Sequence, residues 1–351
     1  MLPTFAYLYG APKAEGDIRL SESDFKVFEQ LPFSPCGEGE HLLIHIRKKG
    51  LNTVFVAKQL AKYFSVKENL VSYAGLKDRF AITEQWFGVH LPGIKQYDLR
   101  DLSIDGLEVL SYARHNKKLR TGALTGNRFE ITLRNVTDLN EVARKWHAIS
   151  EYGVPNYYGE QRFGIEGGNI ERAQALFAGE KVKDKKKRGI YLSAARSLLF
   201  NHILSQRIDK NQFDTMQVGD VLMLEGTQSV FSLNEIDDVI QQRFIKKDVD
   251  ITAPLWGAGQ LMTSGKPLEL EQQLPEKHQD MCQGLAKFGL KQERRRIRLS
   301  LSDGNIEINE ADQSIILTFT LAAGCFATTI LRELLAYKDL TQRSGSVENR
   351  A

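Results

Sequence analysis

The sequence HLLIHIRKKGLNTVFVAKQLAKYF, residues 41–64, predicts a strand followed by a helix. Its first part mostly alternates apolar and polar residues, as half-buried antiparallel strands do, with Leu42, Ile44 and Ile46 on one side. Asn52 or Thr53 can then cap a helix. In that helix apolar residues recur every three to four positions, at Val54, Ala57, Ala61 and Phe64. The segment therefore indicates a sheet with a helix packed on one face.

The period of two also occurs on both sides of this segment. It is found in the groups Phe25/Val27, Phe129/Ile131/Leu133, Ile306/Ile308 and Ile315/Leu317/Phe319. Directly after the helix, Ser65-x-x-Glu68 has the pattern of a capping box for a further short helix. We expect several strands of one sheet with helices on one face.

The amino-acid composition changes near Gly153. Residues 153–168 contain several glycines and a proline, and longer helical patterns follow. A chain of 351 residues has room for about two domains at ~150 residues each. Residues 153–298 would form the second one. If the strands after residue 298 rejoin the first sheet, this second part is an insertion, which the pattern alone does not decide.

Charge is nearly balanced, since 47 Lys and Arg face 44 Asp and Glu, a net charge of +3. Against this balance, basic residues cluster at 114–120, 181–188 and 294–298. Such clusters bind phosphate backbones by releasing counterions. Each one could instead be a solvated surface run. Three clusters in one chain favour RNA or DNA as a partner.

The sequence shows no motif for export, for a metal or for a nucleotide cofactor. Cys36, Cys282 and Cys325 are too far apart for a zinc site, and the start lacks a secretory signal, so we expect reduced thiols in a cytoplasmic protein. The uncharged residues 313–331 break at Gly324 and are interpreted as strand, turn and helix start. The glycine motifs for nucleotide binding and the histidine motifs for metal binding are incomplete. Two classes of function are left: a binding protein without catalysis, or an enzyme in which a side chain performs the chemistry.

One stretch offers such a side chain. SYAGLKDRFAITEQW, residues 72–86, predicts two short strands joined by a loop that displays Asp78. The neighbouring Lys77 and Arg79 should keep this carboxylate ionised and attract a polyanion. An ionised carboxylate can act as a nucleophile or a base. The alternative is an aspartate used only for its turn geometry.

The segment from Gly75 to Gln85 resembles the catalytic motif of the tRNA pseudouridine synthase D family. Four other segments resemble further motifs of that family in the same order: Ser23–Glu29, Lys118–Phe129, Pro155–Gly164 and Gly324–Glu333. The matches run from near the start of the chain to near its end. Their coincidence is far more specific than the aspartate loop alone.

This resemblance implies a stand-alone isomerase that converts uridine 13 of tRNA into pseudouridine without a cofactor or metal. It implies an α+β fold, in which residues 1–152 and 299–351 form a discontinuous catalytic domain with a mixed, mainly antiparallel sheet. Residues 153–298 would be a family-specific inserted α/β domain. We expect a monomer that binds tRNA and needs neither a membrane nor a protein partner.

The resemblance also assigns site residues. It makes Asp78 the catalytic residue and places Asn127 and Phe129 beside the bound uridine, with Phe25 and Phe326 as further pocket residues. Periodicity alone would place the three phenylalanines in the core. Arg19 lies where the family has a basic residue, with a role toward phosphate or toward the aspartate. Thr83 and Gln85 are candidates for bracing the loop.

Contacts to the RNA backbone are expected from Lys77, Arg79, Arg114, Lys117, Lys118, Arg120, Lys185, Lys186, Lys187 and Arg188. Two other functions stay open: an RNA-binding module without chemistry, and an isomerase acting on a different RNA. Attack of Asp78 on the ribose C1′, attack on the base, and removal of the 2′ proton also stay open as mechanisms.

Overall fold

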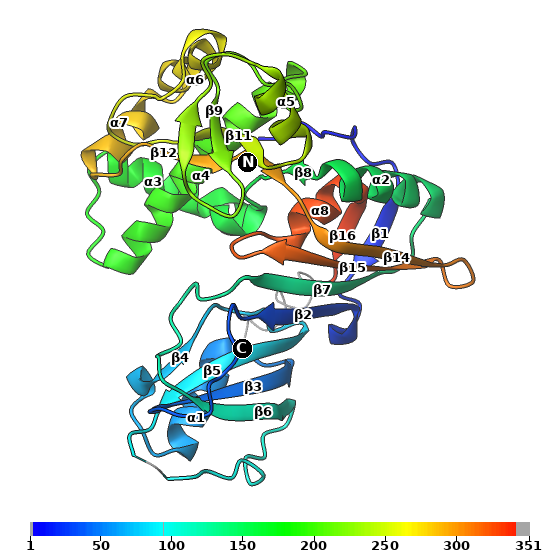
Figure 1. Cartoon of the computed structure of the whole chain (residues 1–351), viewed down its shortest axis with the longest axis vertical. Coiled ribbons are helices and arrows are strands. Elements are labelled where there is room, and N and C mark those ends of the chain that lie inside the picture. Colours follow the sequence, from blue (N-terminus) through cyan, green and yellow to red (C-terminus); the bar gives the residue numbers. More distant parts are fainter. Residues whose placement is uncertain (1–2, 94, 342–351) are drawn as a thin grey trace. The chain divides into compact units, whose positions relative to one another are not determined.

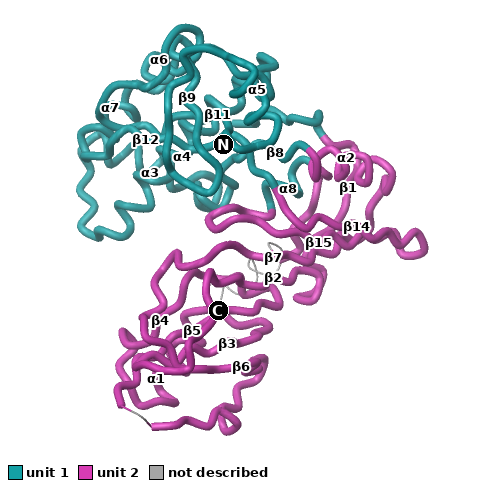
Figure 2. Tube along the Cα trace, in the orientation of Figure 1, with its two compact units in different colours: residues 1–11, 152–300, 328–333 teal, residues 12–151, 301–327, 334–351 magenta. Residues whose placement is uncertain are grey.

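The computed structural model describes residues 3–93 and 95–341. The chain forms two compact units (Figure 2). Unit 1 consists of Met1–Ala11, Tyr152–Ser300 and Thr328–Glu333, and unit 2 of Pro12–Glu151, Leu301–Ala327 and Leu334–Ala351. Unit 1 thus takes in two short segments that the predicted boundaries gave to the catalytic domain. That residues 153–298 are a domain specific to one family stays a prediction.

Unit 2 is built on an eight-stranded sheet (Figure 1). Its strands run in the order β14-β15-β7-β2-β5-β3-β6, and β4 also pairs with β5. Only β2 and β5 pair in parallel within the described part of this sheet, so it is mixed and mainly antiparallel. The strands are β2 (Phe25–Gln30), β3 (His41–Lys49), β4 (Val71–Tyr73), β5 (Ile82–His90), β6 (Leu107–His115), β7 (Gly126–Leu133), β14 (Ser302–Asn309) and β15 (Ser314–Ala322).

A second, two-stranded parallel pair joins β1 (Glu15–Ile18) to β16 (Ala336–Asp339) in unit 2. The helices α1 (Thr53–Tyr63) and α2 (Leu139–Tyr152) lie on one face of the large sheet. On that face α1 packs over Ile44 and Ile46 of β3, and Trp146 of α2 lies against Phe319 of β15, with ring centroids 5.7 Å apart. The strands between the two helices carry the aspartate loop.

Helix α1 begins as predicted, because the Asn52 side chain accepts a hydrogen bond from the Phe55 amide. Of the predicted apolar positions, Ala57 and Ala61 are buried as expected, but Val54 is 45% exposed, and Val56 and Leu60, which were not predicted, are fully buried. The capping box at Ser65 is wrong. Ser65 has a φ of 55°, and the following 3-10 turn (Glu68–Leu70) starts from Lys67 without a side-chain cap.

The late strands rejoin the first sheet. β15 pairs with β7 over eight residues, from Ile315 opposite Leu133 to Ala322 opposite Gly126. The chain then turns and enters α8 (Ala327–Leu334), so the interpretation of residues 313–331 as strand, turn and helix start is confirmed. Among the described residues, every helix is too short or too polar to span a lipid bilayer.

Unit 1 has its own four-stranded sheet, in the order β10-β9-β11-β12. All three pairings are antiparallel, so this unit is itself α+β and the expected α/β class is wrong for it. Helix α4 crosses the core, where Ala195, Leu199 and Ile203 are buried. The strands are β8 (Val154–Pro155), β9 (Val221–Leu224), β10 (Val230–Ser232), β11 (Val249–Leu255), β12 (Glu293–Arg296) and β13 (Arg298–Leu299), and the helices are α3 (Gly168–Phe177), α4 (Lys185–Asp209), α5 (Asp238–Ile245), α6 (Gly265–Lys277) and α7 (Gln279–Lys287).

Candidate active site

Asp78 lies in the loop between β4 and β5, and its side chain is 36% exposed. The Arg19 guanidinium donates a hydrogen bond to it, with 2.7 Å from Nη2 to Oδ2. The other guanidinium nitrogen of Arg19 binds Asp339 Oδ2 at 2.5 Å. Because the Arg19 side chain is only 5% exposed, its charge is held between two carboxylates. Of the two roles expected for Arg19, toward phosphate or toward the aspartate, the structure shows the pairing with Asp78.

The cations next to Asp78 in sequence have other partners. The Lys77 ammonium lies 2.8 Å from Glu29 Oε2, and the two side chains are 7% and 0% exposed. Arg79 Nε donates to the Gly50 carbonyl at 3.2 Å. Adjacent residues of a loop point in different directions, so neither cation is the one paired with Asp78. A contact of Lys77 with RNA phosphates, expected from sequence, is ruled out in this structure by its burial.

Two side chains, those of Gln85 and Thr53, brace the loop that carries Asp78. Gln85 Nε2 donates to the Gly75 carbonyl at 2.5 Å, as expected for a bracing role. Thr53, the first residue of α1, donates to Gln85 Oε1 at 3.0 Å and accepts from the Lys77 amide at 2.9 Å. Thr83 is fully buried, and its hydroxyl has no hydrogen-bond partner among the described residues. Bracing thus falls to Gln85 and Thr53 rather than Thr83.

Three of the predicted uridine pocket residues, Phe25, Asn127 and Phe129, share one face of the sheet, whereas Phe326 lies between β15 and α8. In the pairing of β2 with β7, Glu29 lies opposite Asn127 and Val27 opposite Phe129. The Asn127 side-chain oxygen is buried and lacks a hydrogen-bond partner within the described structure. A buried amide oxygen without a partner is costly, and it marks a place where a ligand can donate a hydrogen bond.

The aromatic residues connect this face to the carboxylate. The Arg19 guanidinium lies 4.2 Å from the centre of the Phe25 ring, and Phe25 meets Phe129 edge-on at 6.4 Å. Phe129 also stacks on Phe319 at 5.4 Å. Phe25 and Phe129 are 4% and 6% exposed, so they belong to the core, as periodicity predicts. Phe326 is half-buried after β15, and none of its described contacts joins it to Asp78.

Sequence reasoning missed Lys48 and gave Glu29 no role. Lys48 is fully buried, and its ammonium donates to the backbone carbonyl of Asp78 at 3.0 Å. A signal was present, because the alternation of Leu42, Ile44 and Ile46 continues to position 48 and places a lysine on the buried side. The same alternation from Phe25 and Val27 points Glu29 inward.

Of the first basic cluster, the later residues are available to a partner. Lys117, Lys118 and Arg120 are exposed. Arg114 is not: its guanidinium donates to the carbonyls of Leu91 and Lys95, each at 2.6 Å. The structure therefore gives Arg114 a role in holding the chain that follows β5, and its expected contact with phosphate stays a prediction.

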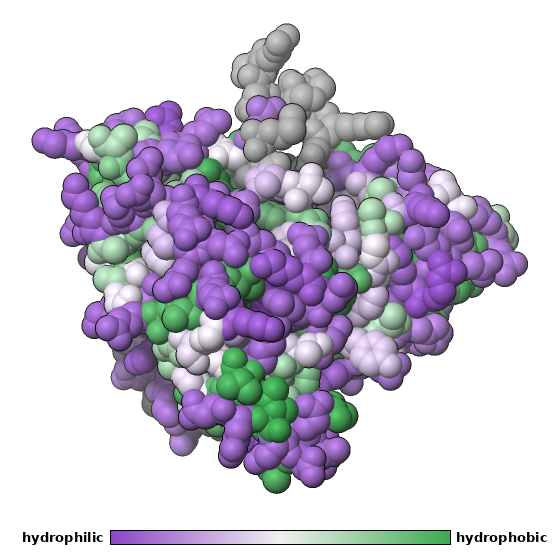
Figure 3. Space-filling view, turned by 90° about the horizontal axis from the view of Figure 1, so that it is seen from above, coloured by the Kyte–Doolittle hydropathy of each residue, from purple (hydrophilic) through white to green (hydrophobic). Residues whose placement is uncertain are grey.

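The second basic cluster opens helix α4. Its N-cap Asp184 accepts hydrogen bonds from the amides of Lys186 and Lys187. Lys185, Lys186 and Lys187 are exposed. Cations in the first turn oppose the helix dipole, so these lysines do not serve the stability of α4. The molecular face shown in Figure 3 is mostly hydrophilic, with apolar residues in small groups.

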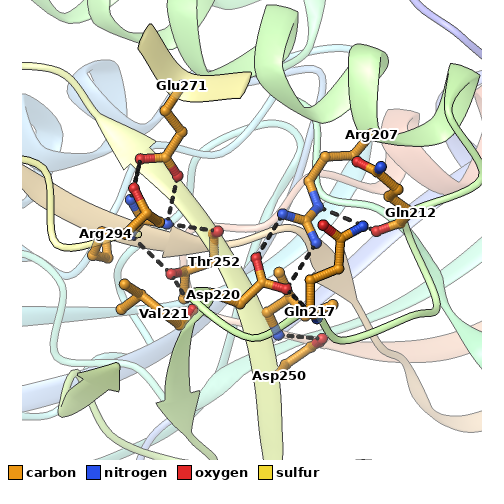
Figure 4. Close-up of polar contacts among 11 residues, drawn as sticks. Arg207, Gln212, Gln217, Asp220, Val221, Asp250, Thr252, Glu271 and Arg294 are labelled. Atoms are coloured by element: carbon orange, nitrogen blue, oxygen red, sulfur yellow. Dashed lines mark hydrogen bonds and ion pairs between the residues drawn. The ribbon is translucent and has the colours of Figure 1, made fainter. Parts of the chain in front are cut away.

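The third basic cluster is structural, which corrects its interpretation as nucleic-acid binding (Figure 4). The Arg294 guanidinium makes two hydrogen bonds of 2.9 Å to Glu271 and two more to Thr252. Arg298 binds Asp214, and Arg296 binds Glu225. These arginines lie on the antiparallel strands β12 and β13, where tertiary neighbours supply the carboxylates. Folding thus pairs three of the four arginines of this run with carboxylates, while Arg295 binds the side-chain oxygen of Asn156.

The fold is that of a solved protein. The crystal structure of a protein described as tRNA pseudouridine synthase D from Methanosarcina mazei superimposes with a TM-score of 0.73. The match covers 96% of this chain and 97% of that one, at 20% sequence identity. At this identity the likeness shows the fold: α+β with a mixed main sheet.

Sequence relatives carry the assignment further. A tRNA pseudouridine synthase D of Colwellia psychrerythraea is 64% identical over 98% of this chain and 96% of its own length. Those of Shewanella oneidensis and Aeromonas hydrophila are 48% and 45% identical, over 96% and 99% of this chain and 90% and 99% of their own lengths. Fold, site and relatives define an isomerase of the pseudouridine synthase class.

A model of the family tRNA pseudouridine synthase D (TruD) matches residues 2–183 and 171–334. The chain belongs to this family, and the resemblance found in the sequence is confirmed.

Proposed function

We propose that this protein isomerises uridine 13 of tRNA to pseudouridine, with Asp78 as the catalytic carboxylate. The observation that carries the proposal is the half-exposed Asp78 carboxylate held by the buried Arg19 guanidinium, on the sheet face that also carries the unpartnered Asn127 oxygen. Family membership supplies the reaction class. The position in tRNA rests on the family resemblance.

The reaction breaks the bond from uracil N1 to ribose C1′ and forms one from C5 to C1′. The proton on C5 is lost and N1 gains one, so the product has the composition of the substrate. Each possible route, attack on C1′, attack on the base or removal of the 2′ proton, needs a carboxylate beside the sugar. The target nucleotide must therefore leave its stack and enter the site.

Arg19 suits this task because it orients Asp78 without covering it. One Asp78 oxygen binds the guanidinium, and more than a third of the side chain stays accessible. Asn127 can accept a hydrogen bond from the uracil N3–H through its free oxygen. Phe25 and Phe129 offer ring edges from the core and shape the wall of the pocket, and Phe326 is the ring exposed enough to stack on a base.

The rest of the tRNA would be bound through its phosphates by the exposed cations of both units. Exposed and available for this are Lys117, Lys118, Arg120, Lys185, Lys186, Lys187 and Arg79, and the half-buried Arg188 is a further candidate. We further propose that the enzyme works as a monomer in the cytoplasm, without a cofactor, and that unit 1 contains the family-specific inserted domain.

The Asp78→Asn variant tests the proposal, because the amide keeps the volume and removes the charge. Isomerisation of a tRNA transcript should be abolished, while the Kd for that transcript changes little. Asp98→Asn is the matched control, since the Asp98 side chain binds only the nearby Arg100 in the described contacts. An Asp78→Asn enzyme that works at the wild-type rate would overturn the assignment.

Mapping pseudouridine in cellular RNA with and without the gene tests the substrate. Loss confined to position 13 of tRNA is the expected result. Loss at other RNAs would favour a different target, and an unchanged map would favour an RNA-binding protein without chemistry.

A further inference from the structure

Lys48 is the least expected side chain of the sheet. It lies on β3, where it follows Ile46 on the buried side, and it is 0% exposed. The ordinary solution for such a position is another aliphatic residue, because taking an ammonium out of water is costly. A buried lysine at the end of an apolar row therefore needs a specific reason.

The contacts of Lys48 supply that reason. Its Nζ donates to the backbone carbonyl of Leu51 at 2.6 Å and to that of Asp78 at 3.0 Å. Leu51 immediately precedes the cap of α1, and Asp78 stands at the tip of the loop between β4 and β5. One ammonium thus ties the start of the helix to the backbone of the candidate catalytic residue.

No carboxylate lies within ion-pair distance of Lys48 among the described residues. Its pKa is lowered to about 8, chiefly by burial, with the Asp78 carboxylate raising it and the Lys77 charge lowering it. This arrangement differs from that of Lys77, whose ammonium has Glu29 as a direct partner. The charge of Lys48 is balanced mainly through space, by the carboxylate of Asp78.

The other braces leave the Asp78 backbone unheld. Gln85 binds the carbonyl of Gly75, and Thr53 binds the amide of Lys77. Lys48 binds the carbonyl of Asp78 itself, so it fixes the peptide from which the carboxylate projects. A displacement of about 1 Å at a reacting group can cost about 10²-fold in rate.

Resting on the proposed function, we propose that Lys48 is a positioning residue for the isomerisation: it holds the Asp78 backbone and sets the carboxylate where the uridine sugar is bound. It touches neither substrate nor reacting atoms and acts through Asp78. Burying the Lys48 ammonium lowers stability, and in return the loop gains a hydrogen-bond donor to the Asp78 carbonyl.

The Lys48→Met variant separates positioning from support of the fold. Methionine has nearly the same length and no charge, so the variant loses two hydrogen bonds to backbone carbonyls but also the cost of keeping an ammonium out of water. We expect an unchanged or higher Tm, a Kd for tRNA within about twofold of wild type, and a single-turnover rate about 10²-fold lower. A purely structural lysine would lower Tm and leave the rate of the folded enzyme unchanged, and that result would overturn the proposal.

Lys145→Met is the matched control. Lys145 is also buried, at 7% exposure, but it lies on α2 beside Glu141, at 3.5 Å. It should keep the wild-type single-turnover rate. A similar loss of rate in both variants would show a general effect of removing a buried lysine from unit 2 and would also overturn the proposal.

The double variant Lys48→Met with Asp78→Asn tests whether Lys48 affects the rate through Asp78. If Lys48 acts through Asp78, the double variant retains the residual rate of Asp78→Asn alone. A further loss of about 10²-fold would show that Lys48 acts elsewhere. If Asp78→Asn is itself fully active, the proposed function fails independently of Lys48.

Amide hydrogen exchange gives a readout that does not depend on activity. In Lys48→Met, the amides of residues 76–80 should exchange about tenfold faster than in wild type, because one anchor of the loop is removed. Lys145→Met should leave them unchanged. If these amides exchange at the wild-type rate in Lys48→Met, the proposal that Lys48 anchors the loop is refuted. This outcome does not depend on knowing an RNA substrate.

Discussion

The Asp78 site of unit 2 and the Arg294 network of unit 1 each place an arginine side chain that is at most 5% exposed against a carboxylate. In unit 1 the pairing is saturated: Arg294 and Glu271 bind through two parallel hydrogen bonds, and Thr252 takes the remaining donors (Figure 4). In unit 2 the pairing of Arg19 with Asp78 is not saturated, since the Asp78 side chain is 36% exposed. A saturated network needs nothing from outside, whereas an unsaturated one leaves groups for a ligand.

Arg207 and Asp220 repeat the saturated pattern in unit 1, with two hydrogen bonds of 2.7 and 3.1 Å and almost no exposure. Around Asp78, by contrast, Arg19 Nε and the Asn127 oxygen are buried atoms without partners within the described residues. Buried arginine nitrogens without partners also occur in unit 1, at Arg196 and Arg295, so the feature particular to Arg19 is that its carboxylate partner Asp78 is accessible.

The largest effect should follow from Arg19→Met. Removing the cation that orients Asp78 should lower the single-turnover rate by about 10²–10³-fold, while the tRNA Kd changes little. Arg19→Lys, which keeps a charge without the two-pronged geometry, should recover part of the loss. If both variants are as fast as wild type, the Arg19–Asp78 pair is no more functional than the pairs of unit 1.

Breaking the saturated network should act on stability instead. Arg294→Met leaves Glu271 buried without its partner, so the free energy of unfolding should fall by about 3–5 kcal/mol. Urea denaturation measures this loss, and the rate per folded molecule at low temperature should stay at the wild-type value. A rate loss without a stability loss would place Arg294 in the functional machinery and remove the contrast.

An acid-sensitive group in unit 1 allows a pH test. Burial, followed by the neighbouring charges of His278 and Lys277, lowers the pKa of His202 to about 4. The unfolded chain, with an ordinary His pKa near ~6.5, then binds the proton more readily than the folded one. His202 should therefore reduce stability progressively as the pH falls from about 6.5 toward 4.

His202→Phe should remove this part of the acid sensitivity while keeping a ring next to that of His278, whose centroid lies 4.5 Å from that of His202. The comparison is the urea midpoint of variant and wild type at pH 7.0 and at pH 4.5. An equal drop in both proteins would show that His202 is as easily protonated in the folded chain as in the unfolded one.

The smallest effect concerns the exposed lysines. Replacing Lys118 or Lys186 by glutamine should reduce the slope of log affinity for tRNA against log salt concentration by ~1 for each phosphate that the variant no longer binds. Arg296→Gln is the control from the neutralised cluster, because Arg296 is paired with Glu225, and it should keep the wild-type slope. Unchanged slopes in all three variants would assign the lysines to bulk solvent.

Much of unit 2 was predictable from local pattern. The strands at Leu42, Phe129 and Ile315 and the cap at Asn52 follow from alternation and from a side chain that bonds its own helix. The α/β class predicted for the second part failed because strand direction is set by pairing between distant segments. Ser65 failed as a cap because the chain takes a left-handed turn there.

The amino-acid sequence by itself determined the family, the loop that carries Asp78 and the alternation that fills the sheet, since these depend on residues close together in the chain. Only the tertiary structure decided which cation serves Asp78. Lys77 and Arg79 are its neighbours in sequence, yet Arg19 and Lys48 reach it, 59 and 30 residues away along the chain. Side-chain pairing depends on distance in space and on burial, and strand pairing brings these groups together.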